Sequence, residues 1–239
     1  MGLTIHYRLQ SDEADADATR SVLSRLRSRA LDLPFAGVGD LIELRGDDCD
    51  FEKADRRAPH RWLLIQAATH VECGNWHFNV APKHIIAFTT CPGDGCEDAN
   101  FGLCRYPASI MVDDPQRPGA RRRLACPGPK WRWSSFCKTQ YASDPHCGGV
   151  QNFLRCHLSV VALLDQAATL GILGDVHDEG NYWEHRDAQR LTTEVGQWNE
   201  QIAGFVGRIK DAFGDPAIAP ITQFPDFEHL EARGRKDER

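Results

Sequence analysis

The chain has 239 residues, of which 41% are hydrophobic and 26% charged, and its net charge at pH 7 is −6. This composition is typical of a globular protein, and the length suits one large domain because single cores stop growing near roughly 250–300 residues. A negative net charge argues against a general nucleic-acid-binding surface, and no run approaches the roughly 20 apolar residues that span a bilayer. We therefore expect neither nucleic acid nor a membrane as a partner.

The first part of the chain predicts strands and one helix. Residues 3–9 alternate apolar and polar side chains, which is typical of a half-buried strand. Residues 13–31 repeat apolar side chains every three or four positions, with acids early and arginines late, as expected of a helix whose charges match its dipole. Further strands are predicted at residues 40–45, 61–71 and 84–90, and the apolar runs of the last two suit covered central strands.

The middle of the chain is rich in cysteine, glycine and proline between residues 91 and 130. We expect a long excursion there with one short strand at residues 109–112. A loop of this length is uncommon unless it has a function or is held together by internal cross-links such as a metal site. A further strand is predicted at residues 131–141.

The C-terminal part predicts two long helices. Residues 150–170 are apolar nearly all round and therefore predict a buried helix, whereas residues 182–213 predict an amphipathic one. The polar residues 175–181 are expected to form the turn between them. The sequence thus predicts an α+β fold, with a mixed sheet of about five strands, one N-terminal helix and two long C-terminal helices in a single domain at 1–214. Residues 215–239 are expected to form a partly disordered tail.

The cysteines point to a reducing compartment. Their number, nine, is odd, and the first residues lack the basic and apolar regions of a signal peptide. We therefore expect a cytoplasmic protein whose cysteines are thiols, metal ligands or nucleophiles rather than disulfides.

A glycine-rich turn between Cys91 and Cys96, followed by Cys104, indicates a zinc knuckle, because Zn²⁺ takes four sulfur or nitrogen ligands in a tetrahedron. The alternative is a tight loop with incidental thiols. A fourth ligand would come from one of three residues, Cys126, Cys73 or His84. The predicted zinc set is Cys91, Cys96, Cys104 and Cys126.

A second candidate site precedes the buried helix. A thiol at Cys147, at the helix N-terminus, is expected to have a lowered pKa, with His146 or His157 as the proton carrier. The glycines 148 and 149 would let the backbone approach an anion. The competing interpretations are a plain strand-to-helix turn and a hydrogen-bonded structural histidine at position 157, because an unpaired polar group in a core is costly.

Two functions from different classes follow. The first is a hydrolase or group-transfer enzyme with a site between the 91–104 loop, the 131–141 strand and the helix that starts near residue 150. Its candidate catalytic residues are Cys147, Cys137, His157, His146 and Glu179. Its candidate anion-binding residues are Lys138, Arg155, Gly148 and Gly149.

The second is an interaction or accessory protein with a zinc-stapled cysteine loop. Composition favours neither function, but we prefer the second because many small α+β chains without a recognisable motif are binding or accessory proteins. Its candidate partner-binding residues are Trp131, Trp133 and Trp183, since tryptophan is enriched at binding hot spots. The chain contains no Walker loop, no Gly-x-Gly-x-x-Gly and no Gly-x-Ser-x-Gly, which argues against P-loop, Rossmann and α/β-hydrolase sites.

Overall fold

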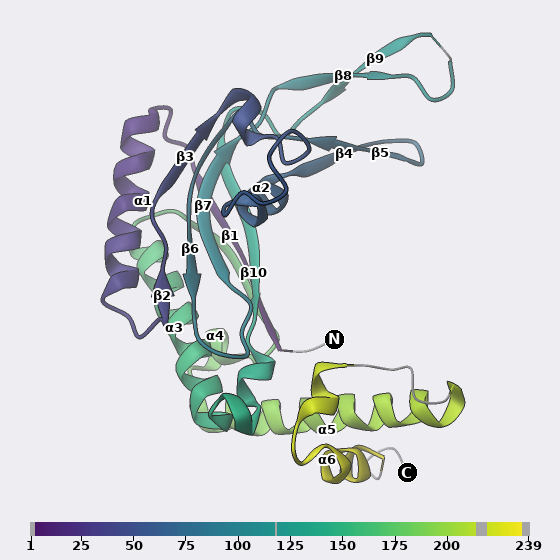
Figure 1. Cartoon of the computed structure of the whole chain (residues 1–239). Coiled ribbons are helices and arrows are strands. Elements are labelled where there is room, and N and C mark those ends of the chain that lie inside the picture. The colour runs from purple at the N-terminus through teal and green to yellow at the C-terminus, as the bar shows by residue number, and fades with distance from the viewer. Residues whose placement is uncertain (1–2, 118, 214–218, 236–239) are drawn as a thin grey trace.

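A seven-stranded sheet forms the centre of the computed structural model, which describes residues 3–117, 119–213 and 219–235 (Figure 1). The strand order is β11-β1-β10-β7-β6-β2, and β3 pairs with β6 beside β2. Its strands are β1 (Thr4–Ser11), β2 (Gly37–Val38), β3 (Ile42–Arg45), β6 (His84–Cys91), β7 (Ala99–Arg105), β10 (Trp131–Lys138) and β11 (Leu173–Asp178). The α+β class is confirmed, but the sheet has seven strands rather than five, and the described pairs are antiparallel rather than mixed.

Two helices cover one face of this sheet, α1 (Ala16–Leu31) and α3 (Gly149–Thr169) (Figure 1). The helix α1 begins where the Asp15 carboxylate accepts the backbone N–H groups of Asp17 and Ala18, which satisfies two of its unpaired first-turn donors. It buries its apolar stripe against α3 and β6. Both helices lie where the sequence periodicity predicts them. Within the described ranges, no helix is long and apolar enough to cross a membrane.

The helix α2 (Arg61–Ala67) lies on the opposite face of the sheet (Figure 1). The sequence predicts a strand at residues 61–71. That prediction is wrong for residues 61–67. The helix buries Leu63, Leu64 and Ala67 and leaves Trp62 exposed, which is a helical rather than an alternating pattern. This apolar run is too short for its periodicity to distinguish a buried helix from a buried strand. The 3-10 helix η1 (Gly46–Cys49) precedes it.

Two hairpins project from the same end of the molecule (Figure 1), and they contact each other through β4 and β9. They are formed by β4 (Thr69–Cys73) with β5 (Trp76–Val80), and by β8 (Ser109–Asp113) with β9 (Arg121–Ala125).

The expected excursion at residues 91–130 is wrong over its first part, because β7 is a central strand there. Its small residues are what its position requires. A Cβ added at Gly102 would lie 2.5 Å from the Cβ of Ala87 on β6, so only glycine lets the strand approach at this point. Gly102 and Cys104, two of the residues that predict a loop, therefore belong to a buried strand.

The C-terminal region also differs from the expected pattern. The predicted polar turn at residues 175–181 contains most of the edge strand β11. The predicted helix at 182–213 is two helices, α4 (Tyr182–His185) and α5 (Ala188–Phe213), because Arg186 adopts φ +55° between them. The 3-10 helices η2 (Gln140–Ser143) and η3 (Pro145–Cys147) lead into α3.

Part of the predicted tail is folded. Within 215–239, the structure describes residues 219–235, which form η4 (Pro220–Gln223) and α6 (Phe227–Gly234). These elements bury Ile221, Phe224, Phe227 and Leu230 against Val206 and its neighbours on α5. The remaining tail residues, 215–218 and 236–239, lie outside the described residues.

Candidate functional site

The hydrogen-bond ladder between β7 and β10 is interrupted. These neighbours are paired only where Arg132 lies opposite Cys104. Farther along, the backbone carbonyl of Asn100 accepts two side-chain hydrogen bonds instead, from the Tyr7 hydroxyl at 2.7 Å and from the Trp133 indole N–H at 2.9 Å. Side chains from two strands, β1 and β10, thus satisfy a carbonyl of β7 that a regular ladder would have paired with backbone.

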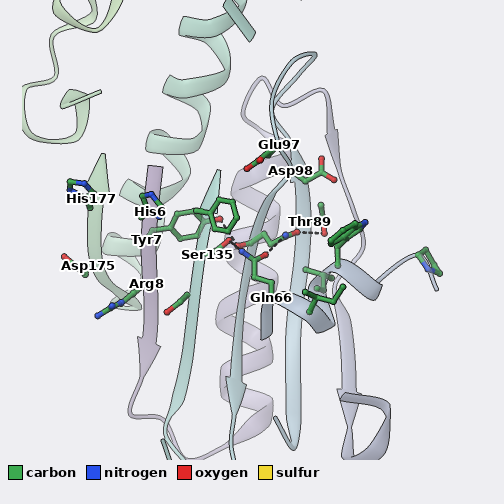
Figure 2. Close-up of a pocket in the computed structure, with 17 residues that line it drawn as sticks. His6, Tyr7, Arg8, Gln66, Thr89, Glu97, Asp98, Ser135, Asp175 and His177 are labelled. Atoms are coloured by element: carbon green, nitrogen blue, oxygen red, sulfur yellow. Dashed lines mark hydrogen bonds between the residues drawn. The ribbon is translucent and has the colours of Figure 1, made fainter. Parts of the chain in front are cut away.

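A chain of polar side chains lies beside this interruption (Figure 2). The Thr89 hydroxyl donates to the Asn100 side-chain oxygen at 2.8 Å, and the Asn100 amide donates to the Gln66 oxygen at 2.5 Å. The Gln66 amide then donates to the Ser135 hydroxyl at 2.6 Å. Burial raises the pKa of Tyr7 well above its usual value, so that hydroxyl keeps its proton and remains a donor. Both amide side chains of the network, Asn100 and Gln66, thus have hydrogen-bond partners within it.

The polar chain forms the floor of a cavity of about 1030 Å³ on the α2 face of the sheet. Its apolar lining comes from α2, the segment before it and β10, and consists of Pro59, Trp62, Leu63, Ile65 and Phe136. Two of these side chains are unusually exposed for large aromatics, Trp62 at 76% and Phe136 at 48%. Large apolar side chains that face a concave opening indicate a binding surface.

Charged and imidazole side chains stand around the cavity (Figure 2). On the β1 and β11 side they are His6, Arg8, Asp175 and His177, and just before β7 they are Glu97 and Asp98. The exposed faces of neighbouring strands explain the first group, because His6 lies opposite His177 and Arg8 lies opposite Asp175. The His6 ring stacks with His177 and contacts Phe136, at centroid distances of 6.1 and 6.0 Å.

A smaller cavity of about 390 Å³ adjoins the first and shares Arg8, Gln66 and Ser134 with it. Arg132 lines it as well, and none of its lining residues is acidic. Arg8 lies opposite Ser134 and Arg132 lies opposite Gln10, so the two arginines are diagonal neighbours on one face of β1 and β10. Neither guanidinium forms an ion pair within the described part of the chain. The small cavity is therefore a positively charged extension of the large one.

The predicted zinc set is not assembled. Cys104 lies opposite Ile85 near the start of β6, whereas Cys91 ends that strand. Six residues of extended strand at about 3.3 Å each separate them by about 20 Å, far beyond the reach of one zinc ion. The Cys104 thiol instead donates to the Arg132 carbonyl at 3.0 Å, and Cys126 lies just beyond β9.

Cys91 and Cys96 do have cysteine neighbours, but different ones. They gather with Cys137 and Cys156, a group we call the thiol cluster. A hydrogen bond between Cys96 and Cys156 raises the pKa of Cys96 and lowers that of Cys156. Cys156 is fully buried, and its thiol contacts the Pro92 carbonyl at 3.3 Å.

The predicted nucleophile Cys147 has the opposite pKa shift from the one expected. Partial burial and the carboxylates of Asp144 and Asp94 raise the pKa of its thiol. Asp144 also caps η3 by accepting the His146 backbone N–H at 2.8 Å. The segment acts as a helix-entry turn, and Gly148, at φ +104°, supplies the left-handed residue that begins α3.

The other predicted catalytic residues hold the core together. His157 lies between Thr139, at 2.9 Å from Nδ1, and Asp178, at 3.1 Å from Nε2, and all three are buried. This Thr-His-Asp sequence of contacts has no access to a substrate. The buried Cys137 thiol donates to the Glu97 carbonyl at 3.1 Å, and the Glu179 carboxylate accepts the Thr4 backbone N–H at 2.9 Å.

The predicted anion-binding side chains are also engaged. The Arg155 guanidinium donates to the carbonyls of Pro34 and Pro92 and to the Asn152 side chain, at 2.6, 3.0 and 2.7 Å. The Lys138 ammonium lies 4.6 Å from the centre of the Tyr141 ring. These contacts fix the turn before β7 and leave Arg155 little capacity for an anion.

Two of the three tryptophans predicted to bind a partner are buried, and the third is half-buried. Trp131 and Trp133 are 0% and 2% exposed, because they lie on the core side of β10. Trp183 is half-buried beneath the Arg186 guanidinium, which lies 4.5 Å from its ring. The exposed aromatics of the cavity, Trp62 and Phe136, were missed. Phe136 shared the alternation of β10, but only the fold shows which side of that strand is open.

No protein-family model matches the chain, and no curated protein or solved structure is significantly similar to it.

Proposed function

We propose that this chain is a binding protein whose cavity takes a small molecule with a flat apolar body and an anionic end. The observation that carries the proposal is the exposure of Trp62 and Phe136 on opposite elements of one cavity of about 1030 Å³. Ligand sites in proteins measure roughly 300–1,000 Å³ and combine apolar walls with few polar groups. The cavity has both properties.

The floor supports binding rather than chemistry. The side-chain amides of Gln66 and Asn100 form hydrogen bonds with each other and with Ser135 and Thr89. An apolar ligand that covers them therefore leaves neither amide without a hydrogen-bond partner. Such a network holds its shape before the ligand arrives, which reduces the entropic cost of binding. None of the predicted catalytic residues lines the cavity.

The anionic end of the ligand is inferred from Arg8 and Arg132. Both line the smaller cavity, which no acidic residue lines, and neither guanidinium has an ion-pair partner in the described ranges. Guanidinium groups bind carboxylates, sulfonates and phosphates through paired N–H donors. Glu97 and Asp98, just before β7, would repel an anion placed in the opposite orientation.

A cytoplasmic location belongs to the same proposal. All nine cysteines are free thiols, including the thiol cluster in which Cys96 contacts Cys156. Unbridged cysteines at such close range suit a reducing compartment.

The proposal is tested with anilinonaphthalene sulfonate, a fluorescent probe with flat rings and one anionic group. We expect a single saturable site, and we expect Trp62→Ala and Phe136→Ala each to weaken it at least about tenfold, equal to about 1.4 kcal/mol. The matched control is Trp76→Ala, because Trp76 is also exposed, at 55%, but lies on β5 outside the cavity.

The charge of the probe provides a second comparison. Replacing Arg8 and Arg132 together by glutamine should weaken the sulfonate probe but leave binding of the uncharged N-phenylnaphthylamine nearly unchanged. Probe binding that is unsaturable, or that Trp76→Ala weakens as much as Trp62→Ala does, would show that the cavity is not the site.

A further inference from the structure

The hairpin of β4 and β5 places two imidazoles and a carboxylate on one face. His70 and Glu72 are two positions apart on β4, so their side chains point the same way. His77 lies directly opposite Glu72 on β5. The strands are joined through Gly74, whose φ of +61° suits a two-residue hairpin turn and fixes this register.

The three side chains converge on one point. The Glu72 Oε1 atom lies 3.9 Å from His70 Nε2 and 3.6 Å from His77 Nδ1. The two imidazole rings meet edge to face at a centroid distance of 5.5 Å. All donor atoms lie within 4.8 Å of one another, and in the described ranges no other set of three histidine, cysteine or acidic side chains comes as close.

We propose that His70, Glu72 and His77 form a site for a divalent first-row transition metal ion of the Zn²⁺, Ni²⁺ and Cu²⁺ class. Two ligands of one tetrahedral zinc lie about 3.4 Å apart at ordinary bond lengths, so small side-chain rotations convert the present distances into coordination. Two imidazoles and one carboxylate select transition metals over Mg²⁺ and Ca²⁺, which prefer oxygen ligands alone.

The position of the group determines what kind of site this is. Each of the three side chains is more than 60% exposed, so an ion could enter without unfolding the hairpin. Three protein ligands leave at least one coordination position for water or for a donor atom of another molecule. Such a site binds a metal reversibly and ties β4 to β5 when it is loaded.

The thiol cluster is the competing zinc holder in this chain. It contributes sulfur ligands from Cys91, Cys96, Cys137 and Cys156, but no three of its thiols come within 4.8 Å of one another. Zinc titration of the variants separates the two groups, because they lie on different elements and share no residue.

The experiment is a calorimetric titration of metal-stripped protein with zinc chloride. We expect one site per chain, and we expect His70→Ala, His77→Ala and Glu72→Gln each to weaken it at least about tenfold, as for loss of a metal ligand. The matched control is His229→Ala, since His229 is an exposed imidazole on α6. Cys96→Ser should leave zinc affinity unchanged.

A second measurement uses the wild-type protein alone. Co²⁺ bound through nitrogen and oxygen lacks the intense near-ultraviolet band of cobalt thiolates, and zinc should shift the ring resonances of His70 and His77 in NMR spectra. Zinc affinity that survives His77→Ala but not Cys96→Ser, or a strong thiolate band with Co²⁺, would overturn the proposal.

Discussion

His157 Nε2 lies 3.1 Å from Asp178 Oδ2, and both side chains are fully buried. Burial alone would raise the pKa of Asp178. The contact with His157 and the backbone N–H groups of Trp183 and Gly180 outweigh burial and lower the pKa below its ordinary value. The ionised carboxylate therefore connects α3, β11 and the start of α4.

This pair predicts an acid-dependent loss of stability. A carboxyl whose folded pKa is lowered stabilises the fold at pH above its unfolded value of about 3.9, and this contribution is lost as pH falls through the folded pKa. Asp178→Asn should lower the free energy of unfolding at pH 7 by about 1–3 kcal/mol, because buried donors lose their charged acceptor. The free energy of unfolding of this variant, from urea denaturation, should fall less steeply below about pH 4 than that of the wild type. Equal slopes would contradict the assignment.

The contact between α5 and α6 depends on glycine. A Cβ added at Gly234 would overlap the backbone carbonyl oxygen of Glu200, whereas a Cβ at Gly196 meets nothing within 4 Å. Gly234→Ala should therefore separate α6 from α5 and lower the melting temperature. Gly196→Ala, in the interior of the same α5 helix, should raise stability by up to about 1 kcal/mol through helix propensity. Limited proteolysis should cleave within 219–235 faster in Gly234→Ala only, and equal cleavage in both variants would count against this packing.

The sequence predicts an element correctly where its apolar periodicity extends over several turns. The helix α1 and the helix α3 repeat their apolar positions over several turns, and both were predicted nearly to their ends. The helix α2 has only two turns, and its run of apolar residues fits a buried strand equally well. The strand β7 was missed because Gly102 reads as a loop residue, although contact with Ala87 is what requires it.

The candidate site shows the same limit more strongly. His6 and Arg8 stood on the polar side of a correctly predicted strand, but their meeting with Trp62 depends on α2 lying across the sheet. The cysteines illustrate the converse. Cys91 and Cys104 are close in sequence, yet the β6–β7 hairpin carries them to opposite ends of a strand. Proximity along the chain predicts a shared site only where no strand intervenes.

Thiol reactivity should follow burial rather than helix position. Burial raises the pKa of Cys49 to about 11 and that of Cys104 to about 12, and it raises the pKa of Cys137 as well. Native protein treated with iodoacetamide at pH 7 should leave these three unlabelled, since the thiolate is the reactive form. Cys147 should label slowly, at a rate below that of a free thiol, because its pKa is raised too. Peptide mass spectrometry gives the order in which the thiols are labelled. Rapid, selective labelling of Cys147 would contradict this prediction and support Cys147 as a nucleophile.

Two substitutions in the floor of the cavity should destabilise the fold by different amounts. Tyr7→Phe removes one donor from the Asn100 carbonyl but leaves the Trp133 indole in place, so the acceptor stays satisfied. We expect a loss of about 0.5–1.5 kcal/mol, the net value of one hydrogen bond.

Gln66→Met has a different consequence, because its amide joins the two halves of the floor. The substitution leaves the Ser135 hydroxyl and the Asn100 amide without the partners they now have at 2.6 and 2.5 Å. Buried groups left unpaired cost about 1–3 kcal/mol each, so Gln66→Met should destabilise more than Tyr7→Phe although it conserves side-chain volume. Urea denaturation at pH 7 measures both. A larger loss for Tyr7→Phe would mean that the carbonyl of Asn100, and not the amide chain, holds β7 and β10 together.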